Sequence, residues 1–141
     1  MNTTTTHHRI SAVRVGETMH RGVLTCERET PLTGVARAMA EHAVHCIVVE
    51  SGSGDGGPLW GVVSDLDLVA AATVGNLDDQ TAGGSAASPI VMVTPAETLE
   101  RAAQLMTEHS TAHLLVVDGA DSRPVGVLST LDIASALADG D

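Results

Sequence analysis

The sequence predicts an α/β protein built from two βαββα units, and three observations lead to this prediction. The chain has 141 residues, which suits one compact domain or two small repeats that share a core. Its apolar side chains are almost all aliphatic, with Trp60 as the one aromatic residue. Most directly, "GVVSDLD" begins at Gly61 and "GVLSTLD" begins at Gly126, which is 126 − 61 = 65 positions later.

Longer segments repeat as well. "LTGVARAMAEH" from Leu32 aligns with "LERAAQLMTEH" from Leu99, an offset of 99 − 32 = 67 positions. "HCIVVE" from His45 aligns with "HLLVVD" from His113, an offset of 113 − 45 = 68 positions. Small insertions in turns account for the changing offset, so the two halves are related units and not a strict array.

Each unit starts with a short β-prone run and a helix. "VLTC" (Val23 to Cys26) is the first predicted strand. Thr30 and Pro31 predict a helix start, with Thr30 as the N-cap and Pro31 at the first helical position. Apolar residues then follow the i, i+3, i+4, i+7 spacing of a buried helix face in both units. These residues are Leu32, Val35, Ala36 and Met39, and Leu99, Ala102, Ala103 and Met106.

Two strands and a second helix complete each unit. The helix is followed by an unbroken aliphatic run, "CIVVE" or "LLVVD", then by a turn rich in Gly, Ser and Asp. A second run follows, "LWGVVS" or "PVGVLS", and continuous apolar strands are expected where both sheet faces are covered. The Ala-rich segments "DLDLVAAATV" and "TLDIASALA" are then predicted to be helices.

These elements predict a domain organisation. Residues 1–12 are a disordered tail because their Thr/His-rich sequence has little to bury, and 13–74 are the first repeat. Residues 75–85, part of a polar Gly/Ser stretch, are a linker, and 86–138 are the second repeat. Each unit would leave one hydrophobic sheet face exposed. We therefore expect the repeats to pack with pseudo-two-fold symmetry around a central cleft, where a ligand would sit.

Composition excludes several classes of partner. The formal net charge is −11, so the chain lacks the clustered cations that nucleic acids and anionic membranes require. No apolar run reaches the ~18 residues of a membrane span, and the N-terminal stretch has no apolar signal region. Cys26 and Cys46 fit neither a metal spacing nor a disulfide framework. We expect a protein of the reducing cytoplasm.

The repeated motif permits two interpretations. Ser64 with Asp67, and Ser129 with Asp132, have the spacing of a capping box before an apolar helix. The same geometry suits a ligand, because a helix N-terminus attracts phosphate and an Asp one turn later can accept both hydroxyls of a ribose. Capping boxes favour Glu or Gln at the acidic position, whereas both copies here have Asp.

The order of these blocks, present twice, resembles a tandem pair of CBS (cystathionine-β-synthase-type) domains, often called a Bateman module. The resemblance covers about residues 13–138 and includes "VGETMHRGVLTC", "AMAEHAVHCIVVE", "LMTEHSTAHLLVVD" and both Gly-h-h-Ser-x-x-Asp copies, where h is a hydrophobic residue. It implies that Asp67 and Asp132 bind ribose hydroxyls of an adenosine-containing ligand, and that Ser64 and Ser129 contact phosphate. It also implies apolar walls for the purine, contributed by the other repeat. These walls are Leu24 and Val44 for one site, and Val91 and Ala112 for the other.

The chain departs from the family pattern at the phosphate end. His45 and His113 occupy the place where an Arg is frequent, and Ile47 and Leu115 stand where Pro is common. A neutral imidazole donates a hydrogen bond but supplies less charge than a guanidinium. Either monophosphates such as AMP are therefore expected to bind better than triphosphates such as ATP, or the affinity is expected to rise at lower pH.

His42 and His45, and His109 and His113, raise the alternative of a metal site, with Cys46 beside the first pair. We favour a simpler role for His42 and His109, which complement the dipoles at helix C-termini. No metal is assigned, because no carboxylate or further Cys has ligand spacing nearby.

The sequence therefore predicts a regulatory sensor and not an enzyme, since no catalytic constellation is evident. The expected ligand is AMP, ADP or ATP, and less favoured ones are S-adenosylmethionine and NAD; no cofactor is required. The resemblance further implies a homodimer that signals to an unidentified regulated protein. Two alternatives stay open, which are a ligand-free structural or interaction module and a metal- or redox-responsive module.

Overall fold

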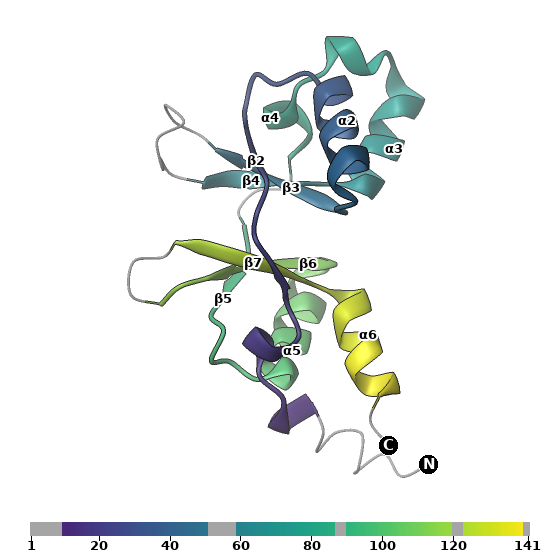
Figure 1. The fold of residues 1–141 in the computed structure, drawn as a ribbon. Coiled ribbons are helices and arrows are strands. Elements are labelled where there is room, and N and C mark those ends of the chain that lie inside the picture. The colour runs from purple at the N-terminus through teal and green to yellow at the C-terminus, as the bar shows by residue number, and fades with distance from the viewer. Residues whose placement is uncertain (1–9, 51–58, 87–89, 120–122, 140–141) are drawn as a thin grey trace. The chain divides into compact units, whose positions relative to one another are not determined.

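The structure, a computed structural model, describes residues 10–50, 59–86, 90–119 and 123–139. The chain divides into two compact units, each with its own sheet and helices (Figure 1). One unit comprises Leu24–Ile90, and the other comprises Met1–Val23 together with Val91–Asp141. The two are described separately below. In the part of the chain that the structure describes, no helix has both the length and the apolar composition that a membrane span requires.

The unit formed by Leu24–Ile90 has the predicted βαββα order. Its elements are β2 (Thr25–Glu27), α2 (Leu32–His42), β3 (Cys46–Glu50), β4 (Leu59–Ser64) and α3 (Asp65–Val74). The sheet order is β2-β3-β4, with β2 parallel and β4 antiparallel to β3. Leu32, Val35 and Met39 of α2 pack against the buried side chains of β3 and β4, as their helical spacing predicts.

The second unit repeats this order. Its elements are β5 (Met92–Val93), α5 (Leu99–His109), β6 (His113–Val117), β7 (Pro124–Ser129) and α6 (Thr130–Ala138). β5 runs parallel and β7 antiparallel to β6. Leu99, Ala102 and Met106 form the buried face of α5. The two predicted motif helices, Asp65–Val74 and Thr130–Ala138, therefore have the predicted bounds.

The sheet of this second unit has a fourth strand, which comes from the N-terminal segment. β1 (His20–Arg21) pairs antiparallel with β7, so the sheet order is β1-β7-β6-β5. The preceding 3₁₀ turn η1 (Val15–Glu17) is fixed by the bond from the Val15 N–H to the Glu97 carbonyl, 2.8 Å long. Residues 13–23, which the sequence placed with the first repeat, thus pack in the unit of the second repeat.

Three local expectations differ from the structure. Within the predicted tail 1–12, residues 10–12 are helical because Ile10 packs against a hydrophobic core, and residues 1–9 lie outside the described residues. The predicted linker 75–85 forms the 3₁₀ turn η2 (Leu77–Asp79) and the short helix α4 (Ala82–Ser85), since the Thr81 hydroxyl caps α4 and Ala82 is fully buried.

The third difference concerns the start of α2. Pro31, not Thr30, is the N-cap, and its backbone is extended, with ψ of 146°. Pro31 forms a β-bridge with Thr81, and the Leu32 N–H donates to the Gln80 carbonyl at 2.9 Å. This long-range pairing holds Pro31 outside the helix, so the helix begins one residue later than its local sequence predicts.

Candidate functional site

The first motif copy lies where β4 passes into α3. Ser64 is the N-cap, and its hydroxyl accepts from the Asp67 N–H at 3.2 Å. In return Oδ2 of Asp67 accepts from the Ser64 N–H at 2.8 Å and from the Ser64 hydroxyl at 3.0 Å. The predicted capping box is therefore present. It uses one carboxylate oxygen of Asp67, and Oδ1 has no hydrogen-bond partner among the described residues.

The second copy has the same junction between β7 and α6. The Ser129 hydroxyl accepts from the Asp132 N–H at 3.2 Å, and Oδ2 of Asp132 accepts from the Ser129 N–H at 2.8 Å. Asp132 differs from Asp67 in burial, since its side chain is 7% exposed whereas Asp67 is half-buried. It also has a further partner, because Nδ1 of His20 lies 2.9 Å from its Oδ1.

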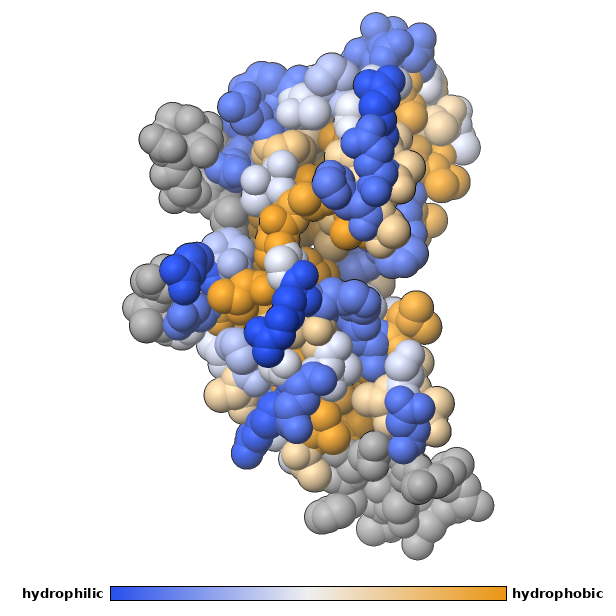
Figure 2. All heavy atoms as spheres, viewed as in Figure 1, coloured by the Kyte–Doolittle hydropathy of each residue, from blue (hydrophilic) through white to orange (hydrophobic). Residues whose placement is uncertain are grey.

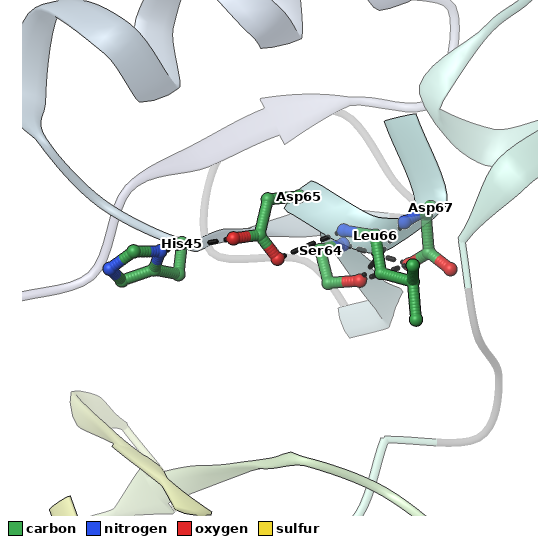
Figure 3. Close-up of polar contacts among 5 residues, drawn as sticks. All are labelled: His45, Ser64, Asp65, Leu66 and Asp67. Atoms are coloured by element: carbon green, nitrogen blue, oxygen red, sulfur yellow. Dashed lines mark hydrogen bonds and ion pairs between the residues drawn. The ribbon is translucent and has the colours of Figure 1, made fainter. Parts of the chain in front are cut away.

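The two copies also differ at the first helical residue after the Ser, where the sequence predicted phosphate binding. In the first copy Asp65 follows Ser64, and its Oδ2 lies 3.0 Å from Nδ1 of His45 (Figure 3). Its Oδ1 accepts from the Leu66 N–H at 2.9 Å. A carboxylate thus occupies the first turn of α3, which satisfies the positive end of the helix and repels an anion. His45, predicted to meet phosphate, is paired with this carboxylate.

In the second copy the residue after Ser129 is Thr130, which carries no charge. The Thr130 N–H donates to the Ala112 carbonyl at 3.0 Å. The Leu131 N–H has no partner among the described residues, and its side chain is 64% exposed. The first turn of α6 therefore offers an open backbone donor and a neutral hydroxyl, which suit an oxyanion better than the first turn of α3 does.

The predicted apolar walls lie near the motif of their own repeat. Leu24 and Val44 are half-buried against the core of the unit that holds Ser64 and Asp67. Val91 is half-buried against the core of the other unit, and Ala112 is exposed beside α6. The assignment of each wall to the site of the opposite repeat remains a prediction.

Two residues with a bearing on the site were missed by sequence reasoning. Asp65 was visible as the difference between "SDLD" and "STLD". His20 carried no such signal, because it lies 132 − 20 = 112 positions from Asp132. Only the pairing of His20 with Val127 in the β1–β7 register brings the imidazole to that carboxylate.

The cysteines and histidines do not form a metal centre in the described ranges. No three His, Cys, Asp or Glu side chains gather there in an arrangement that could hold an ion. His42 and His109 lie in the last turns of α2 and α5, as their predicted role at the helix dipoles requires. His113 opens β6, opposite Ser129. Cys26 and Cys46 are free thiols, and burial raises the pKa of both.

Comparison with known proteins agrees with the repeat architecture. The family model described as "CBS domain" matches residues 15–73 and 86–139. Hypoxic response protein 1 of Mycobacterium tuberculosis is 28% identical over 123 residues, which are 86% of this chain and 82% of that protein. A crystal structure of Hypoxic Response Protein I with two coordinated zinc ions has 25% identity and a TM-score of 0.68, and the match covers 87% of this chain and 98% of that one.

Two further solved structures contain adenosine compounds. CBSX2 in complex with AMP is 27% identical, with a TM-score of 0.68, over 91% of this chain and 98% of that chain. The CBS domain pair of protein MJ0100, in complex with 5′-methylthioadenosine and S-adenosyl-L-methionine, has a TM-score of 0.79 over 92% of this chain and 98% of that chain. Its sequence identity is 16%, so this second likeness is one of fold.

Proposed function

Because this chain belongs to the CBS domain family and carries two repeats, we propose that it is a regulatory module that binds an adenosine-containing nucleotide. One observation carries the proposal. In each repeat a capping box holds an Asp carboxylate at a strand-to-helix junction, by bonds from the Ser N–H to Oδ2 that are 2.8 Å long in both copies. A carboxylate held in this way is pre-organised to accept ribose hydroxyls, as acidic residues do in dinucleotide-binding folds.

The ligand class is AMP, ADP or ATP, with Ser64 and Ser129 at the phosphate. CBSX2, at 27% identity, was crystallised with AMP, which supports this class. Asp65 and the net charge of −11 oppose a long polyphosphate, so AMP is favoured over ATP. The module carries out no catalysis of its own, resides in the cytoplasm, and acts through a regulated protein that responds to the bound nucleotide.

Exposed apolar side chains support the proposal of a homodimer. Leu66, Val69 and Val74 of α3 are 72%, 62% and 83% exposed. Hydrophobic residues are visible at the surface over α3 in Figure 2. Leu131 of α6 occupies the position that Leu66 has in α3, and it is 64% exposed. Apolar faces of this kind on a soluble domain mark contact surfaces.

Substitution of both motif carboxylates tests the nucleotide proposal. In D67N/D132N the amide keeps an oxygen that can accept from the Ser N–H, so the capping geometry is largely retained, but the charge that attracts ribose hydroxyls is lost. We expect AMP to raise the melting temperature of the wild type and not that of the double variant. The measurement is a thermal-shift panel with AMP, ADP, ATP, S-adenosylmethionine and NAD.

The competing function is a ligand-free structural module, and the capping boxes favour it because they explain the Ser and Asp side chains without a ligand. In that case no compound of the panel would stabilise either the wild type or D67N/D132N. A metal-responsive module, as the zinc ions of Hypoxic Response Protein I suggest, would instead retain zinc through purification.

A further inference from the structure

The two Ser-x-x-Asp copies differ in what already contacts their carboxylates. In both copies Oδ2 is used by the capping box. Oδ1 of Asp67 has no partner among the described residues, whereas Oδ1 of Asp132 lies 2.9 Å from Nδ1 of His20. Since a carboxylate only accepts, this nitrogen carries the proton and donates. Because Asp132 is 7% exposed, a ribose hydroxyl that approaches it would compete with the imidazole for the one accessible oxygen.

His20 is well placed to hold this position. Its backbone is fixed in β1, where His20 pairs with Val127 of β7. Asp132 is 7% exposed, so a hydrogen bond to its charge is stronger than one at a fully solvated carboxylate. The imidazole itself is 78% exposed, so it can swing away without unfolding anything.

Among the described residues, the first copy has no counterpart of His20. The side-chain contacts of Asp67 there are those with Ser64, and none of them uses Oδ1.

We propose that His20 makes the two copies unequal, so that a nucleoside binds first at Asp67 and reaches Asp132 only by displacing the His20 imidazole. This inference rests on the proposed function and adds to it the order of occupancy and the residue that sets that order. Adenosine is the appropriate probe, because it carries the ribose and lacks the phosphate whose binding Asp65 and Thr130 would affect differently.

The experiment is a calorimetric titration of the full chain with adenosine. The wild type should show one stronger and one weaker site. H20A frees Oδ1 of Asp132 and should raise the affinity of the weaker site about threefold to tenfold, the range of one hydrogen bond from an exposed side chain. H20N is the matched control, because its amide nitrogen can take the place of Nδ1, and it should keep the weaker site weak.

Two further variants assign the sites. D67N should remove the stronger site, and D132N should leave it intact. In the H20A background, D67N should retain one site, now with the raised affinity. Thermal unfolding of each variant shows that the differences do not come from loss of folding.

The outcomes separate this inference from the function on which it rests. Two equal sites in the wild type, or an unchanged weaker site in H20A, would overturn the role of His20 while nucleoside binding stood. Loss of the stronger site in D132N but not in D67N would reverse the assignment and overturn it as well. The absence of binding by the wild type and by H20A, to adenosine and to AMP, would overturn the proposed function itself.

Discussion

The pKa of the Cys46 thiol is determined by the surroundings of this residue. It begins β3, is 8% exposed, and lies opposite Ser64 in the β3–β4 register. Burial, and after it the negative charge of Asp65, raises the pKa of its thiol from 9.0 to about 11. Both causes disfavour the thiolate, so Cys46 is an inert core residue beside the site and not a nucleophile.

This pKa predicts slow alkylation of the folded protein. The variant C26A leaves Cys46 as the single thiol. At pH 9 its reaction with iodoacetamide should be roughly fiftyfold slower in the folded protein than in the protein unfolded by urea. The reason is that about one Cys46 thiol in a hundred is ionised in the folded state, whereas about half are ionised in the unfolded state. The folded state also holds this proton more tightly than the unfolded chain. The stability it contributes is therefore complete below pH 9 and is lost as the pH rises through about 11. Equal rates for the folded and the unfolded protein would contradict the raised pKa.

Among the elements, the pairing of β1 with β7 depends on one glycine. A Cβ added at Gly126 would lie 2.5 Å from the His20 carbonyl oxygen and 3.0 Å from Sδ of Met19. The backbone oxygen cannot yield without moving β1. The small size of Gly126 therefore lets the strand that carries His20 approach β7.

We expect G126A to lower the free energy of unfolding by about 1–3 kcal/mol through this overlap. By the same displacement of β1 it should release Asp132 and strengthen adenosine binding there, as H20A does. Urea denaturation measures the first effect and calorimetry the second. G34A is the control, because its Cβ would meet only the Thr30 methyl group at 3.5 Å, and alanine in α2 should gain up to about 1 kcal/mol. Equal stability of G126A and the wild type would show that β1 does not depend on this close approach.

At the scale of the whole molecule, the exposed apolar side chains of α3 lead us to expect a homodimer that forms through this helix. Leu66, Val69 and Val74 lie on one side of this helix with Ala70 and Thr73, and none of these side chains is covered within the structure. A contact between two copies would remove this apolar surface from water.

We therefore expect V69E to convert a dimeric wild type into monomers, since it would place a new negative charge in the contact of a chain that already carries −11. Sedimentation velocity gives the mass of each form. A40E is the matched control, because Ala40 is also an exposed alanine but lies on α2, outside this face, and it should remain dimeric. A V69E protein that keeps the dimeric mass would place the interface elsewhere.

The sequence by itself determined the elements and the motif. The period of apolar residues predicted the helices α2 and α5 and their buried faces, and the Ser-x-x-Asp spacing located α3, α6 and their capping boxes, because these features depend on residues only a few positions apart. Such contacts can be derived from local spacing alone.

Only the tertiary structure decided how the two copies differ. The partnership of His20 with Asp132 spans 112 positions, and the bridge from Pro31 to Thr81 that shifts the start of α2 spans 81 − 31 = 50. No local pattern encodes which backbone edge a distant segment will meet, because such pairing is selected by the burial and hydrogen bonding of the whole unit. The repeated motif therefore predicts two carboxylates of one kind, and the packing of β1 on β7 leaves one of them open and the other paired.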